Sequence, residues 1–171
     1  MELFGYIKAN KLTSEYILRQ DMQEKGETIT ISINDYMSKQ FNINSKEINI
    51  KTAFFINENN IGISKSFEKT DSNYKNWASI SSKLSGNQID TILNDYKSRT
   101  KLIDTIIDKV IENNINGIVI DFNKDQQKES VLRFVIEIAP RLREFGITTA
   151  IVLNENSENN DYINIVDYIV E

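Results

Sequence analysis

Neither cysteine nor histidine occurs in the sequence of 171 residues. Without cysteine the chain has no disulfide framework and no thiolate site, and its compartment stays open, because cysteine-free proteins occur both inside and outside cells. Without histidine it lacks the commonest general base and the commonest metal ligand at neutral pH. Any acid–base chemistry must therefore rest on carboxylates, tyrosine or lysine.

An excess of positive charge and long apolar stretches are also missing. The formal net charge is −5 and basic residues are interleaved with acidic ones, which argues against a nucleic-acid partner. No stretch approaches the ~18 apolar residues of a membrane span, and the N-terminus lacks the apolar run of a secretory signal. The acidic stretch from Glu155 to Asp161 has neither the spacing nor the glycine of a calcium loop. We therefore expect a soluble chain of unknown localisation, with no membrane insertion, no metal and no cofactor.

Proline and glycine are scarce, at one and six residues, so element boundaries have to be read from clusters of Asn, Asp and Ser. The length fits a single domain over residues 1–171. In the first 47 residues the pattern predicts a helix over 13–27, an alternating strand over 27–35 and a short helical turn near 33–41. A hairpin of strands over 48–56 and 61–64 follows, and then a strand over 77–81.

The second half of the chain alternates between amphipathic and continuously apolar segments. The pattern predicts helices over 86–96, 98–114 and 128–146, buried strands over 117–122 and 147–154, and a last helical turn and strand over 163–171. This alternation is typical of a parallel sheet. Ligands of such sheets gather at the carboxyl ends of the strands, here near Asp121 to Asn123, Asn154 and Glu171.

The strand GIVIDFN, together with the helices and strands around it, resembles the catalytic domain of family-18 glycoside hydrolases, most closely the bacterial spore-cortex and cell-surface branch. The resemblance covers Trp77 to the C-terminus and more loosely Ile48 to Ile63, whereas residues 1–47 stay unplaced. It implies an α/β fold whose mostly parallel sheet forms part of a (β/α)8 barrel. The barrel should be incomplete, because the chain has no counterpart of the last two strands and a full barrel needs ~200 residues or more.

The family signature, D-G-x-D-x-D-x-E, falls on residues 116–123 of this chain. Alternation along a strand puts Val119, Asp121 and Asn123 on one face. In the family the final Glu protonates the glycosidic oxygen, the preceding Asp orients the acetamido group of the substrate, and the substrate's own carbonyl attacks the anomeric carbon. Asn123 stands at the position of the acid and cannot donate an acidic proton. The resemblance therefore implies an orienting carboxylate, Asp121, without the acid beside it.

From this substitution we expect no catalytic residues and no enzyme, but a degenerate domain that acts as a structural or protein-interaction module. The alternative is a module that binds N-acetylglucosamine glycans such as peptidoglycan or chitin, and an active glycosidase is the third interpretation. The ligand contacts would be Asp121, Asn123, Trp77 and Asn154. Each also has a simpler interpretation: the polar residues as hydrogen-bonded strand ends, and the tryptophan as part of the core.

An incomplete parallel barrel also has two strand edges with unpaired backbone groups. Three solutions are open: the N-terminal segment, a second copy of the chain, or another protein can cover them. One strand and one helix are little to replace two βα units, so we expect a homo-oligomer or a larger assembly.

Overall fold

The computed structural model describes residues 10–12, 29–32, 47–57, 61–65, 75–122, 128–153 and 159–170. The helix predicted over residues 13–27 and the turn near 33–41 lie outside these ranges. Among the described residues, no helix is both long enough and apolar enough to cross a membrane.

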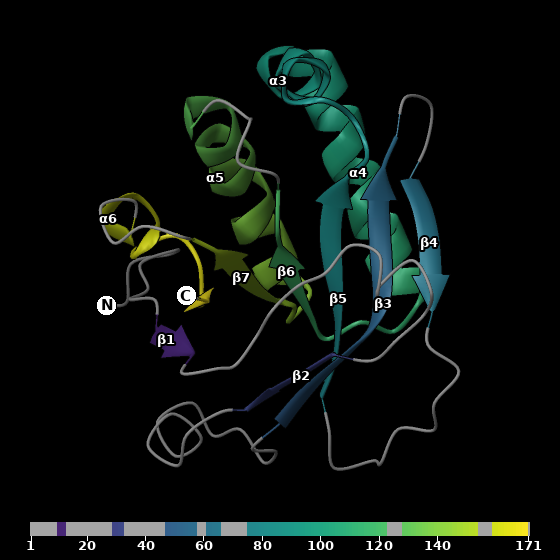
Figure 1. Ribbon diagram of the computed structural model, residues 1–171, viewed down its shortest axis with the longest axis vertical. Coiled ribbons are helices and arrows are strands. Elements are labelled where there is room, and N and C mark those ends of the chain that lie inside the picture. Colours follow the sequence, from purple (N-terminus) through teal and green to yellow (C-terminus); the bar gives the residue numbers. More distant parts are fainter. Residues whose placement is uncertain are drawn as a thin grey trace.

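The described strands form one sheet of eight (Figure 1). Its order is β1-β8-β7-β6-β5-β3-β2, with β4 paired to β3. The strands β3, β5, β6, β7, β8 and β1 run parallel, whereas β2 and β4 are antiparallel to β3. The strands are β1 (Asn10–Leu12), β2 (Ile29–Ser32), β3 (Glu47–Ile56), β4 (Ile61–Lys65), β5 (Lys75–Ser82), β6 (Gly117–Ile120), β7 (Thr148–Val152) and β8 (Tyr168–Val170).

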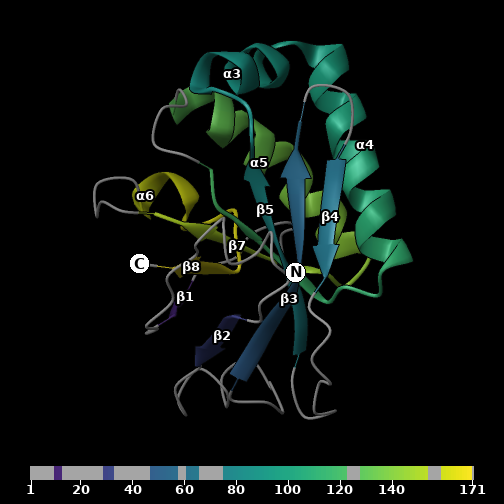
Figure 2. The ribbon, with the colours of Figure 1, turned by 45° about the vertical axis from the view of Figure 1, so that its right-hand side comes forward.

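Four helices complete the described part of the chain: α3 (Gly86–Asn94), α4 (Tyr96–Glu112), α5 (Lys128–Glu144) and α6 (Asn159–Tyr162). The first three lie on one side of the strands, and α3 lies beyond the ends to which β3 and β5 point (Figures 1 and 2). The chain is thus α/β with a mostly parallel sheet, as predicted. Within the described residues β1 and β2 are not paired with each other, so the sheet is part of a barrel rather than a closed one.

Local sequence explains where the helices begin and end. Ser85 starts α3 with a capping box, in which its hydroxyl accepts from the backbone of Gln88 and the Gln88 side chain accepts from the backbone of Ser85. The Asp95 carboxylate accepts from the backbone of Ser98 and starts α4. Gly146, which follows α5, has a φ of 72°, a conformation that favours glycine at a helix end.

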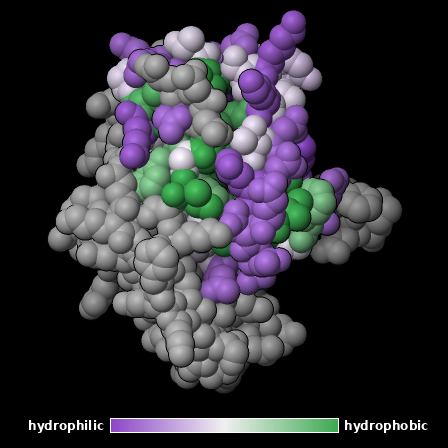
Figure 3. Space-filling model, turned by 90° about the vertical axis from the view of Figure 1, so that its right-hand side faces the viewer, coloured by the Kyte–Doolittle hydropathy of each residue, from purple (hydrophilic) through white to green (hydrophobic). Residues whose placement is uncertain are grey.

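Alternation along the strands divides their side chains between two faces. One face packs on the helices and forms the core, which includes Ile80 of β5, Ile118 and Ile120 of β6, and Phe134 of α5. On the outside of the molecule, hydrophilic residues gather in a band beside smaller hydrophobic patches (Figure 3). This pattern is the one expected where amphipathic helices cover one face of a sheet.

The opposite face, which we call the inner face, is built of three rows of side chains across the strands. The register places Trp77, Gly117 and Thr148 in the first row. The second row is Ala53, Ser79, Val119, Ala150 and Tyr168. The third row, at the carboxyl ends, contains Phe55 and Ser81 and continues to Asp121 and Val152. Such rows fill the interior of (β/α)8 barrels.

Two N-terminal strands occupy positions at the ends of the sheet. The strand β1 pairs in parallel with β8, and β2 pairs with the first half of β3. Strands from the N-terminal segment thus lie at both ends of the sheet, which is the first of the three solutions for covering the strand edges. A homo-oligomer or larger assembly stays a prediction.

Candidate functional site

The polar residues of the inner face are concentrated at the carboxyl ends of β5 and β6. Asp121 directly follows β6, and its backbone N–H donates to the carbonyl of Ile80 at 2.9 Å, which continues the parallel ladder by one residue. Ser81 lies opposite Asp121 on the neighbouring strand and is 6% exposed. Ser79 lies one row below and is also buried. A carboxyl group and hydroxyl groups therefore face the same side at the end where ligands of parallel sheets bind.

The Asp121 carboxyl is the one group of this site with a strongly shifted pKa. Burial raises the pKa of Asp121 to about 6, because removing the charged form from water is costly. In the part of the chain that the structure describes, no cation and no hydrogen-bond donor offsets this rise. A carboxyl group with such a pKa exists in both protonation states near neutral pH, so it can accept a hydrogen bond or donate a proton.

An aromatic ring and a cation border the site on the side of β3. Phe55 is buried in the same row as Ser81. The Nζ atom of Lys83 lies 4.9 Å from the centroid of the Phe55 ring. The backbone N–H of Lys83 donates to the carbonyl of Ile56 at 3.0 Å and so joins the ends of the two strands. A rim with hydroxyl, carboxyl, ammonium and aromatic groups has the chemical character of a polar-ligand site.

Trp77 lies in the first row of the inner face, away from Asp121. Gly117 in the first row and Asp121 in the third row are four positions apart along the chain, a distance of roughly 13 Å in a strand. The tryptophan is 3% exposed, and its ring lies 5.7 Å from that of Tyr168. A Cβ atom on Gly117 would approach the Trp77 ring to 2.5 Å, so the motif glycine leaves the space that this ring fills. The structure thus places Trp77 in the core at the amino ends of the strands.

The structure does not bring all the predicted site residues together. Asp121 occupies the site, whereas Asn123 and Asn154 lie outside the described residues. Ser81, Phe55 and Lys83 were missed, because their place beside Asp121 depends on the pairing of β3, β5 and β6. The alternation of Trp77, Ser79 and Ser81 was the signal in the sequence, but it does not reveal which strands are neighbours.

No protein-family model matches the sequence, and no curated protein matches it significantly. Solved structures do share its fold. A putative sporulation-specific glycosylase from Bacillus subtilis matches with a TM-score of 0.54 and 17% identity, over 74% of this chain and 49% of that one. The spore cortex-lytic enzyme of Bacillus cereus matches with a TM-score of 0.53 and 19% identity, over 69% of this chain and 32% of that one. The chain thus spans half or less of the length of either structure.

The chain thus shares the fold of part of each of these two structures. This supports the resemblance to glycoside hydrolases at the level of the fold. It also corrects the prediction that the chain is not an enzyme, because both structures with this fold are named as a glycosylase or a lytic enzyme. That prediction relied on Asn123 at the position of the acid, on the absence of histidine and on the missing last strands of the barrel. The carboxyl group of Asp121, with its raised pKa, remains available for proton transfer.

Proposed function

We propose that the chain recognises a glycan containing N-acetylglucosamine, of the peptidoglycan or chitin type, at the carboxyl ends of β5, β6 and β7. The observation that carries this proposal is the position of Asp121 at the carboxyl end of β6, where continuing the register by one residue places it opposite Ser81 in the third row of the inner face. A half-buried carboxylate holds an amide N–H strongly, because a hydrogen bond to a charged acceptor is about twice as strong as a neutral one. The N–H of an acetamido group is such a donor, and the sugar hydroxyls suit the serines.

The raised pKa of Asp121 favours cleavage of this glycan as a second candidate function. In that reaction the protonated carboxyl gives its proton to the glycosidic oxygen while the bond from that oxygen to the anomeric carbon breaks. The carbonyl oxygen of the substrate's acetamido group forms the new bond to that carbon, so the protein supplies no nucleophile. Water then opens the cyclic intermediate, and its proton returns to Asp121. A pKa of about 6 leaves an acid protonated often enough to work near neutral pH.

The test is binding and cleavage of chitohexaose and of purified peptidoglycan strands. Calorimetry measures affinity, and mass spectrometry of the incubated glycans measures cleavage. We expect wild-type protein to bind at least one of the two glycans and Asp121→Ala to lose at least about tenfold in affinity, since a hydrogen bond to a charged group contributes about 1.5–3 kcal/mol. Ser81→Ala should lose less. Absence of binding by the wild type to both glycans would refute the proposal.

A matched control is Asp104→Asn, which removes an exposed carboxylate that pairs with Arg141 at 2.7 Å between α4 and α5. It should leave affinity unchanged. Cleavage products that disappear in Asp121→Asn support the second candidate, whereas cleavage that survives in Asp121→Ala shows that another group donates the proton. The protein-interaction role expected from the sequence has its own test in light scattering at micromolar concentration. A compact monomer without concentration dependence would exclude a homo-oligomer.

A further inference from the structure

A buried hydrogen bond joins two helices that follow neighbouring strands of the candidate site. The hydroxyl of Ser130 donates to Oδ1 of Asp90 at 2.5 Å. Asp90 lies on α3, which follows β5, and Ser130 lies near the beginning of α5, which follows β6. The two residues are 6% and 1% exposed. Because water hardly reaches this contact, the bond holds the first turn of α5 against α3.

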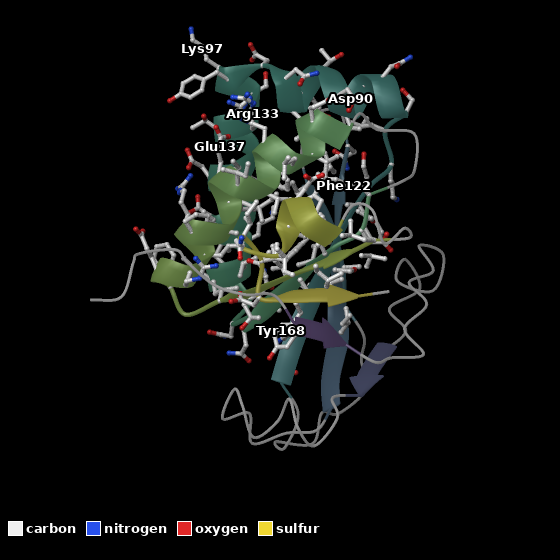
Figure 4. The ribbon with its side chains drawn as sticks, turned by 90° about the vertical axis from the view of Figure 1, so that its left-hand side faces the viewer. Asp90, Lys97, Phe122, Arg133, Glu137 and Tyr168 are labelled. Carbon is white, nitrogen blue, oxygen red and sulfur yellow. The ribbon has the colours of Figure 1, made fainter. Side chains whose placement is uncertain are left out.

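A second contact connects the same part of α5 to the end of β6. The ring of Phe134 lies 5.6 Å from the ring of Phe122, at an interplanar angle of 44°. Phe134 is fully buried and follows Ser130 by four residues, so both side chains project from the same side of α5. Phe122 is the immediate neighbour of Asp121. In Figure 4, Phe122 and Asp90 lie toward the same end of the molecule and Tyr168 toward the other.

These contacts form a continuous path from Asp90 to the candidate site. Asp90 holds Ser130, α5 carries Phe134, and Phe134 packs on Phe122. Asp121 precedes Phe122 in the chain. Its backbone N–H donates to the carbonyl of Ile80, which fixes the backbone of Asp121 to β5. The direction in which the Asp121 side chain leaves the end of β6 is therefore determined from both sides.

We infer that Asp90 is a positioning residue for Asp121. Its hydrogen bond with Ser130 sets the place of α5, and through the contact between the tilted rings of Phe122 and Phe134 it keeps the Asp121 carboxyl directed onto the inner face. The significance for glycan recognition rests on the proposed function, but the positioning itself can be measured without a ligand. Loosening of α5 should let water reach the Asp121 carboxyl. The burial that raises the pKa of Asp121 would then decrease, and so would its pKa.

A second polar link of the same helix provides a matched control. Arg99 of α4 forms a bidentate ion pair with Glu137 of α5. The Nε atom of Arg99 donates to Oε2 of Glu137, and the Nη2 atom donates to Oε1 at 3.1 Å. Glu137 lies seven residues after Ser130, about 10 Å along the helix axis. This pair joins α5 to α4 instead of α3. Glu137→Gln therefore weakens a polar link of α5 without changing any residue on the path to Asp121.

The experiment is an NMR titration of aspartate side-chain carboxyl carbons in the full chain, with the Asp121 signal assigned from its absence in Asp121→Asn. In Ser130→Ala and Asp90→Ala, which each remove one partner of the hydrogen bond, we expect the pKa of Asp121 to fall by about one unit or more, toward the ordinary value of a carboxyl group. Ser130→Thr keeps the hydroxyl and should keep the wild-type pKa, as should Glu137→Gln. If one of the first two variants does not fold, the other decides.

An unchanged pKa of Asp121 in Ser130→Ala or Asp90→Ala would overturn the inference. An equal fall in Glu137→Gln would overturn it too, because it would show a general loosening of the helices. The affinity for chitohexaose is the second measurement. It should weaken about tenfold in Ser130→Ala and stay unchanged in Glu137→Gln. If the wild type binds neither chitohexaose nor peptidoglycan strands, the proposed function fails, while the titration still decides whether Asp90 positions Asp121.

Discussion

Replacing Asp121 with asparagine should stabilise the protein, and the gain should depend on pH. The change keeps the shape of the side chain and removes its charge. In the native protein burial raises the pKa of this carboxyl from 3.8 to about 6. The folded state therefore binds more protons than the unfolded state between these two pH values. The contribution of Asp121 to the free energy of unfolding is therefore most favourable below about pH 4. It decreases as the pH rises through about 6.

The magnitude follows from the size of the shift. Each pKa unit corresponds to about 1.4 kcal/mol, so a shift of about two units sets an upper limit of roughly 3 kcal/mol above pH 7. The carboxyl group is half-buried, and the asparagine amide is itself polar, so we expect a net gain of about 1–3 kcal/mol. For a chain of this size this corresponds to an increase in melting temperature of about 3–10 °C.

Urea denaturation of both proteins at pH 3.5 and pH 8, followed by circular dichroism, measures the effect. The difference in free energy of unfolding between variant and wild type should be close to zero at pH 3.5 and clearly positive at pH 8. Asp104→Asn, which changes an exposed carboxylate on α4, controls for the loss of one negative charge. An Asp121→Asn variant that is less stable than the wild type at pH 8 would refute the reasoning, because it would show that the carboxylate is held by favourable partners.

Two further changes test the packing around the site. Gly117→Ala should destabilise the protein by about 1–3 kcal/mol, because the added Cβ would lie 2.5 Å from the Trp77 ring. The fluorescence emission of Trp77, the single tryptophan, should also shift, and an unchanged spectrum and stability would contradict the tight contact. Arg99→Leu should cost about 3 kcal/mol in urea denaturation, because it leaves Glu137 without its cation and the carbonyl of Leu93 without a donor at 2.8 Å; a loss below about 1 kcal/mol would show that the ion pair contributes little.

Local patterns were sufficient to predict α3, α4, α5 and strands β6, β7 and β8 of the second half of the chain. The last helical turn was misplaced: it was predicted within 163–171, whereas α6 spans Asn159–Tyr162, in a polar stretch whose sequence resembles a loop. The cap at Ser85 and the stop at Gly146 are signals within a few residues of each helix end, and the stripe of isoleucines on α4 repeats at helical spacing. The hairpin of β3 and β4 was also recognisable, because its strands are separated by a short turn. The three residues of β1 carry no such signal. They are a strand only because β8 lies beside them.

The site was predictable in part for the same reason. Asp121 follows a strongly apolar strand, so its position at a carboxyl end could be derived from the order of residues alone. The place of Trp77 at the other end of the inner face follows from its register with Gly117, which is a property of two strands. The Ser130–Asp90 hydrogen bond joins residues forty positions apart on two helices, and its existence depends on how these helices pack.

The pairing of β1 with β8 has a consequence for how the chain acquires its structure. Asn10 lies opposite Tyr168, so almost the whole sequence lies between these partners. During synthesis, β3, β5, β6 and β7 can assemble in the order in which they emerge, with their helices packing on one face as each strand is added. Of the described strands, β1 is made before the others, and its partner β8 is made after them. Contacts between such distant positions form slowly, because the entropy of closing the loop must be overcome first. The N-terminal strand is therefore placed late, after the part of the sheet that carries Asp121 has formed.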